Sequence, residues 1–361
     1  MKIKDICTSI TDGSHNPPQG ISESNFLMLS SKNVFDDCIT TDEPRYLSKE
    51  DYERENKRTR IQPGDVLLTI VGTVGRAAVV PNDISPFALQ RSVAVLHPKT
   101  DICSSRFLMY ALRSKRTYIE NSAKGVAQKG IYLGEVASID LSVPSMKQQA
   151  EIIDTLDRTN AVIRKRQQQL QAFDTLIKAR FVEMFGDYHT NNMGFETHHG
   201  SELFSFSSGK FLPEEKRLSS GIPVYGGNGV AWFTDTPLIS YPTIIIGRVG
   251  ALCGNIHVVY EPVWITDNAI YIKEQKTNKF TLEFLTEMMT IMNFYQYADF
   301  SGQPKITQKP LESLLYLTPP IEMQNTFTAF CKQVNKSKAV VEKALENAKV
   351  LYDSLMQKYF G

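Results

Sequence analysis

The chain has 361 residues, of which 42% are hydrophobic and 22% are charged, and its formal net charge is +1. This composition is typical of a globular protein with room for two well-cored domains, and it lacks the strong positive charge of a protein that binds nucleic acid unaided. No apolar run approaches the ~18 residues that cross a membrane, and the first residues show no signal-peptide core. Five cysteines without a CxxC pair predict reduced thiols in the cytoplasm.

In chain order, the first half is expected to contain a buried strand at 65–71, a glycine-rich loop and a second strand at 92–96. A long helix over 147–185 follows. The second half repeats this order, with strands at 243–247 and 269–272 and a helix over 322–360. The predicted boundaries are 1–143 and 187–318 for two globular domains, with 144–186 and 319–361 as the helical segments. The predicted fold class is therefore α+β, with two mixed α/β domains in a pseudo-two-fold repeat.

The repeat is clearest at the end of each half. Displacing the sequence by 175 residues places 128–186 on 303–361 without a gap. Ten positions are then identical, where roughly four would match by chance. These are Gln128/Gln303, Ile131/Ile306, Ser138/Ser313, Pro144/Pro319, Gln149/Gln324, Asn160/Asn335, Leu170/Leu345, Leu176/Leu351, Phe185/Phe360 and Gly186/Gly361. The repeat further implies that the helix ending at Gly361 finishes close to Met1.

Both long helices carry an apolar stripe with steps of three, four or seven residues, which is the spacing of a coiled-coil seam. About 39 residues reach ~58 Å, which is long for a domain of this size. We therefore expect the two helices to pair antiparallel, the alternative being a solitary surface helix in each domain. The residues predicted to pair the helices are Leu156, Ile163, Leu170, Ile177, Val334, Val341, Leu351 and Leu355.

Motifs for catalysis are absent from the sequence. It contains no phosphate-binding GxxxxGK[ST] loop, no GxGxxG after a strand, and no Cys/His spacing that predicts a metal site. The segment Asn16-Pro17-Pro18-Gln19 approaches the motif of adenine methyltransferases, but Gln19 cannot stack on a flipped base as an aromatic ring does. We predict no catalytic residue, no metal and no cofactor in this chain.

Basic residues gather beside glycines in both halves, as at Arg76, Lys129, Lys210 and Arg248. Glycine lets the backbone approach a phosphate closely, and a neighbouring Arg or Lys supplies charge or base-edge donors. Each such residue alone is typical of a solvated surface. As a set that recurs in both halves, they favour a nucleic-acid-binding face.

With these features the chain resembles the DNA-specificity subunits of type I restriction–modification systems over its whole length. The resemblance depends on DGSHNP (12–17), GDVLL (64–68) and GTVG (72–75) in the first half, and on IPVYGGNG (222–229), IIIGRVG (244–250) and WITDNA (264–269) in the second. It implies that each domain is a target-recognition domain for one half of a split, asymmetric site in double-stranded DNA. It also implies that the helices space the half-sites and dock two methyltransferase subunits, which bind S-adenosylmethionine, and that restriction subunits join them.

The resemblance does not say which side chains touch bases. We expect base recognition in loops within 14–60 and 205–240. The candidate DNA-binding residues are Ser14, His15, Arg76, Lys129, Lys210, Tyr225, Asn228, Arg248 and Lys305. Two other hypotheses stay open, namely a stand-alone bipartite DNA-binding regulator and a protein–protein scaffold without a DNA role.

Overall fold

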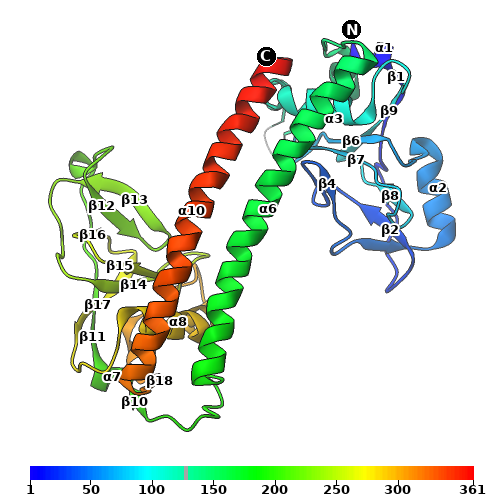
Figure 1. Ribbon diagram of the computed structural model, residues 1–361. Helices are drawn as coiled ribbons and strands as arrows, with labels where there is room; N and C mark the ends of the chain where they lie inside the picture. Colours follow the sequence, from blue (N-terminus) through cyan, green and yellow to red (C-terminus); the bar gives the residue numbers. More distant parts are fainter. Residues whose placement is uncertain (126–128) are drawn as a thin grey trace. The chain divides into compact units, whose positions relative to one another are not determined.

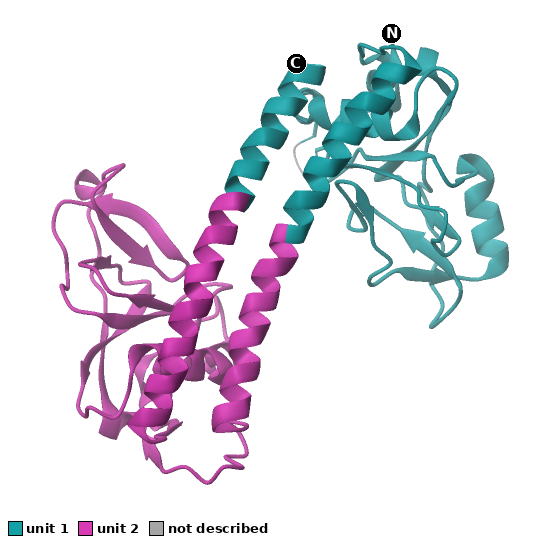
Figure 2. Ribbon diagram, in the orientation of Figure 1, with its two compact units in different colours: residues 1–165, 345–361 teal, residues 166–344 magenta. Residues whose placement is uncertain are grey.

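The computed structural model describes residues 1–125 and 129–361, so Gln128, one of the repeated positions, lies outside the described residues. The chain forms two compact units (Figure 1). The first contains residues 1–165 and 345–361, and the second contains residues 166–344 (Figure 2). None of the helices in the described ranges combines the length and apolarity that crossing a bilayer requires.

The first unit is built on a four-stranded antiparallel sheet in the order β1-β9-β6-β7. Its strands are β1 (Cys7–Asp12), β9 (Val93–Pro98), β6 (Val66–Thr69) and β7 (Ala77–Val79). Both faces are covered, which explains the continuous apolar run of β6. Val66 and Leu68 pack toward the helices, whereas Leu67 packs toward a second sheet, because side chains alternate along a strand.

The two layers that cover this sheet differ in kind. The helical layer consists of α1 (Ile3–Ile6), α3 (Ser105–Ser114), α4 (Arg116–Ser122) and α5 (Leu133–Ser138). The opposite layer is a three-stranded sheet of β5 (Arg45–Leu47), β2 (Phe26–Leu29) and β8 (Phe87–Leu89). A small hairpin of β3 (Val34–Phe35) and β4 (Cys38–Ile39) and the charged helix α2 (Lys49–Thr59) complete the unit. His97 on β9 joins this layer to the sheet, since its ring lies 2.7 Å from the Asp65 carboxylate and 2.9 Å from the Thr59 carbonyl.

The second unit has the same central order, β11-β17-β14-β15, again antiparallel. Its strands are β11 (Phe204–Ser208), β17 (Ala269–Gln275), β14 (Thr243–Gly247) and β15 (Ile256–Val259). The accompanying sheet is β13 (Gly229–Thr234), β12 (Ile222–Gly226) and β16 (Trp264–Ile265), and β12 pairs parallel with β16 as β2 does with β8. The remaining elements are β10 (Thr197–His199), α7 (Gly200–Leu203), η1 (Glu214–Lys216), α8 (Leu282–Met292), η2 (Phe294–Tyr297), α9 (Gln308–Ser313) and β18 (Leu315–Leu317).

Two 40-residue helices, α6 (Met146–Phe185) and α10 (Ile321–Phe360), contribute to both units. In the first unit the beginning of α6 and the end of α10 pack on the core that also contains Ile3 and Ile6. In the second unit the end of α6 and the beginning of α10 meet, and the Phe181 and Phe327 rings lie 5.7 Å apart. Each unit therefore pairs the first part of one helix with the last part of the other.

The predicted helix-pairing residues differ in burial. Leu156, Ile177, Val334 and Val341 are buried, and Ile163, Leu170 and Leu355 are partly buried. The prediction is wrong for Leu351, which is 53% exposed. Tyr352 contacts the core instead, because one residue turns a helix by about 100° and the buried stripe runs through Leu345, Tyr352 and Met356.

Candidate nucleic-acid interface

One edge of each four-stranded sheet gathers the loops that carry the candidate residues. In the first unit the end of β1, the beginning of β9, the end of β6 and the beginning of β7 are neighbours, as the pairs Asp12↔Ala94, Thr69↔Val93 and Leu68↔Ala77 show. In the second unit the equivalent pairs are Ser208↔Ile270, Gly247↔Ala269 and Ile246↔Ile256. The antiparallel order thus brings together loops that are far apart in the sequence.

The loop after the first strand has the same backbone in both units. Gly13 N donates to Val93 O (3.2 Å) and Ser14 N to Leu89 O (2.7 Å). In the second unit Gly209 N donates to Ala269 O (3.0 Å) and Lys210 N to Ile265 O (2.8 Å). A Cβ atom on Gly13 would lie 2.1 Å from a backbone oxygen, and one on Gly209 would lie 2.2 Å from another. Glycine is therefore required at both positions, and Ser14 and Lys210 occupy equivalent places.

The glycine-rich loops after β6 and β14 also match. Gly72 N donates to Lys129 O (3.1 Å), and Gly250 N donates to Pro304 O (2.8 Å). Ile131 N donates to Ile70 O and Ile306 N donates to Arg248 O, both at 2.9 Å. Arg248 is therefore the equivalent of an isoleucine in the first unit. The backbone frame is common to the two units, whereas the cations on it stand at different positions.

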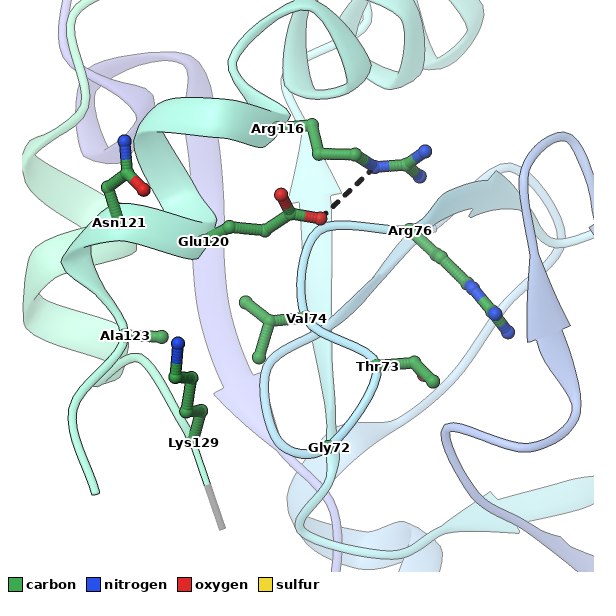
Figure 3. Close-up of a pocket in the computed structure, with 9 residues that line it drawn as sticks. All are labelled: Gly72, Thr73, Val74, Arg76, Arg116, Glu120, Asn121, Ala123 and Lys129. Atoms are coloured by element: carbon green, nitrogen blue, oxygen red, sulfur yellow. Dashed lines mark ion pairs between the residues drawn. The ribbon is translucent and has the colours of Figure 1, made fainter. Parts of the chain in front are cut away.

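Arg76 and Lys129 line a cavity of about 540 Å³ in the first unit, together with Arg116 and Glu120. Figure 3 shows Arg76 and Lys129 on either side of the glycine loop. Arg116 is held by Asp36 at 2.6 Å, and the Arg76 guanidinium lies 5.1 Å from the centre of the Phe35 ring. Lys129 is exposed at the rim, where its ammonium group can meet a phosphate.

Ser14 and His15 lie beside a second cavity of about 480 Å³, which His15 lines with Arg58, Arg91 and Lys124. His15 Nε2 lies 2.8 Å from Asp12 Oδ2, and Arg58 bonds the other oxygen of that carboxylate. The side chain of His15 is 53% exposed, so its ring remains available to a ligand. Ser14 is partly buried, and its backbone carbonyl accepts a hydrogen bond from Arg91 N at 2.9 Å.

The candidates of the second unit lie along the equivalent edge. Arg248 Nη1 donates to Asp267 O (3.3 Å), and Lys305 is exposed and joined to this loop through the bridge Val249↔Lys305. Lys210 is exposed, and its carbonyl accepts a hydrogen bond from Trp264 Nε1 at 3.0 Å.

Tyr225 and Asn228 belong to β12 and to the turn that follows it. Asn228 is exposed in this turn, and Tyr225 is partly buried with its ring 6.0 Å from that of His257. A Cβ on Gly227 would lie 3.4 Å from Gly247 Cα, so the turn passes directly beside the end of β14. The structure therefore brings these two residues to the same sheet edge as Arg248.

Two side chains at these surfaces are absent from the sequence-based candidates. Arg91 is exposed beside His15 and was not recognised because it lies in the turn before β9 and does not follow a glycine. Trp232 on β13 is 38% exposed, and the Arg217 guanidinium lies 4.1 Å from its ring centroid. The position of Trp232, three residues after the IPVYGGNG segment (222–229), was the signal available in the sequence.

The described residues hold no cluster of three or more His, Cys, Asp or Glu side chains that could bind a metal ion. Burial raises the pKa of Cys7 and Cys331 to about 12 and that of Cys103 to about 11. These thiols are protonated and weakly nucleophilic at neutral pH. The chemistry available at the two sheet edges is that of cations, amides and aromatic rings, which suits recognition of phosphates and base edges.

Comparison with known proteins agrees with this picture. Residues 1–172 match the family model described as the type I restriction modification DNA specificity domain. The chain is 24% identical over 289 residues to the type I restriction enzyme EcoprrI specificity subunit of Escherichia coli, covering 72% of this chain and 68% of that protein.

Solved structures share the fold. A type I restriction–modification S subunit from M. genitalium superposes with a TM-score of 0.63 at 18% identity, covering 100% of this chain and 95% of that one. A chain from a structure on complex assembly and conformational transition of the type I system gives 0.52 at 16% identity, covering 100% and 96%. The mixed α/β fold and the resemblance are thus confirmed: residues 1–172 match the DNA specificity domain of type I restriction–modification systems, and the chain is similar in sequence and fold to specificity subunits of those systems, which are not themselves catalytic.

Proposed function

We propose that the chain reads a bipartite, asymmetric site in double-stranded DNA, one half-site with each unit. Residues 1–143 and 187–318 are then the two target-recognition domains, and the sheet edges described above face the DNA. The main support for this proposal is the sheet edge that recurs in both units, because its backbone hydrogen bonds are repeated while its cations stand at different positions. A shared backbone with different side chains is expected of two domains that recognise different DNA sequences.

In this proposal residues 144–186 and 319–361 pair as an antiparallel coiled coil that sets the distance between half-sites. The pairing of helix beginnings with helix ends inside each unit supports it. Inserting four residues at Gln167–Gln169 adds ~6 Å of helix. The gap between half-sites is expected to grow by roughly one to two base pairs at ~3.4 Å each, with both half-site sequences unchanged. Methylome sequencing measures this gap. An unchanged gap would refute the proposal that the helices set the distance between half-sites.

The proposed partners are two methyltransferase subunits, which hold the S-adenosylmethionine, and restriction subunits that join them. The positions of Leu176 and Leu351 support the proposal that two copies of one partner bind. They occupy equivalent positions, one on each long helix, and are 46% and 53% exposed. An exposed apolar side chain repeated without a role in its own core suits an interface formed twice. Because cellular DNA is the ligand, we place the complex in the cytoplasm.

Domain exchange tests the two-reader proposal. Replacing residues 1–143 with the matching domain of a relative is expected to change one half-site only. Replacing residues 187–318 is expected to change only the other half-site. Methylation motifs of hosts that carry each exchange provide the measurement. An exchange that altered both half-sites would contradict separate readers.

The alternative hypotheses differ in DNA affinity. A stand-alone regulator would bind its site tightly without partners, and a scaffold would not bind DNA at any salt concentration. With a net charge of +1, we expect weak binding by the isolated chain and tight, sequence-specific binding once the methyltransferase is added. Gel-shift titrations with and without the partner distinguish the three outcomes.

A further inference from the structure

At one pair of equivalent positions the two recognition domains present opposite charges to a long helix, although the first domain also pairs Asp37 with Arg164 on α6 at 3.0 Å. In the first unit Arg106 on α3 binds Asp157 on α6, with Nε 3.2 and 3.1 Å from the two carboxylate oxygens and Nη2 2.5 Å from Oδ1. Tyr110 donates its hydroxyl to the same oxygen at 2.5 Å, and Arg106 also bonds Asp37. The domain therefore presents a cation and a phenol to an acidic residue of the helix.

The second unit has the reverse polarity. Glu283 on α8 lies 3.4 Å from Lys332 Nζ on α10, and the carboxylate side chain is only 14% exposed. Arg106 and Glu283 each stand two residues after the residue that caps their helix, Ser104 and Thr281. The two pairs thus begin at equivalent positions of the two domains.

A buried glutamine confirms this equivalence on the long helices. Gln149 Oε1 accepts from Ser104 N at 2.9 Å, and Gln324 Oε1 accepts from Thr281 N at 3.0 Å. Asp157 and Lys332 each follow their glutamine by eight residues. An aspartate on one helix is therefore matched by a lysine on the other.

The next turn of α3 and α8 also differs in charge between the two domains. The equivalent of Tyr110 is Glu287, since each stands six residues after its cap. Lys178, Asp174 and Lys338 face Glu287 from the two long helices, and burial raises its pKa. The second domain thus offers two carboxyl groups to a predominantly basic helix surface, where the first offers Arg106 and a phenol to Asp157.

We propose that this reversal makes each recognition domain selective for its own long helix. A second domain placed on α6 would bring Glu283 and Glu287 against Asp157, and a first domain placed on α10 would bring Arg106 against Lys332. Like charges are most unfavourable where both side chains are partly buried, as Glu283 and Asp157 are with 14% and 36% exposure. Lys332 is 69% exposed, so its clash with Arg106 is the weaker of the two. The charges thereby prevent the domains from exchanging positions. The DNA readout of this inference rests on the proposed function, but the stability readout does not.

A chimera that carries residues 187–318 in both domain positions tests the proposal. We expect its melting temperature to rise by ~5 °C when Asp157→Lys is added, since this substitution restores the residue that the second domain meets on α10. Asp154→Lys is the matched control, because Asp154 makes the same change of charge on an exposed face where it pairs with Arg158. Equal effects of the two substitutions, or none from Asp157→Lys, would overturn the inference.

Methylation by the rescued chimera with its partner separates this inference from the proposed function. Restored stability without a methylated site built from two copies of one half-site would leave the charge selectivity standing and contradict the two-reader function. If neither chimera folds, variants of the full-length parent protein test the proposal instead. Lys332→Asp is expected to lower its melting temperature more than Lys336→Asp, and Glu283→Arg added to Lys332→Asp is expected to recover most of the loss. A double variant no more stable than Lys332→Asp alone would refute the proposal.

Discussion

Replacing Gln149 with alanine is expected to destabilise the first unit strongly. Gln149 is fully buried at the first turn of α6. Its Oε1 accepts from Ser104 N at 2.9 Å, and its Nε2 donates to Ile102 O at 2.8 Å and Pro144 O at 2.9 Å. One side chain thus supplies partners to three backbone groups from two segments. Alanine would leave all three without their partner in the same buried region.

The magnitude follows from these three groups. A buried backbone group left without a partner costs ~1–3 kcal/mol, and entry of water into the vacated space would offset part of this. We estimate a total of about 3–5 kcal/mol. For a unit of this size each kcal/mol lowers the melting temperature by about 2–4 °C, which predicts a fall of about 6–20 °C.

Scanning calorimetry of the full chain measures this fall, with Gln148→Ala as the matched control. Gln148 accepts a hydrogen bond from Ser145 N at 3.1 Å in an exposed capping box, so its loss should cost only about 1 kcal/mol. Gln324→Ala should resemble Gln149→Ala, because Gln324 makes the same three bonds in the second unit. If Gln149→Ala melted within ~2 °C of Gln148→Ala, the reasoning from buried partners would be refuted.

Three further predictions concern other parts of the chain. The hydrogen bond to Asp65 raises the pKa of His97. The stabilisation is therefore complete below the ordinary pKa of ~6.5 and is lost as pH rises through the raised value. Calorimetry should show the melting temperature falling as pH rises above ~6.5, and His97→Gln should flatten this dependence. Gly209→Ala should lower the melting temperature by ~10 °C or abolish folding, since its Cβ would lie 2.2 Å from a backbone oxygen, whereas Gly134→Ala, with nothing within 4 Å, should be neutral. Leu176→Glu and Leu351→Glu should each weaken binding of the methyltransferase ~10-fold in calorimetric titrations without changing the melting temperature, and unchanged affinity in both would contradict the proposed docking site.

Local patterns were sufficient to predict the strands and long helices. The apolar run at 65–71 contains β6, the run at 92–96 overlaps β9, and the two long helices end at Phe185 and Phe360. Each of these elements is predicted from a continuous stretch of sequence, either by its apolar periodicity or by the absence of proline and glycine. Leu351 was placed wrongly because a heptad pattern does not say which of two adjacent apolar residues faces the core.

The sheet edge could not be derived in the same way. Ser14 and Lys210 share no side-chain chemistry, and their equivalence is visible only in the backbone bonds around Gly13 and Gly209. Loops of different length shift the alignment between the halves. Arg76 and Arg248 became candidates because each follows a glycine, and the backbone bonds show that they are not equivalent, since Ile70 stands at the place of Arg248. Which of the candidate residues contact bases remains a prediction.

The two kinds of repeated contact explain why one surface varies and another does not. At the sheet edge the frame consists of backbone donors and acceptors, so any residue except proline can stand at positions 14 and 210 without loss of a hydrogen bond. At the beginning of each long helix the contact needs a side chain that both accepts and donates, and glutamine is present in both copies. Recognition of a new DNA sequence can therefore arise at the edge without disturbing the junction between domain and helix, which must stay rigid if the half-sites are to keep their spacing.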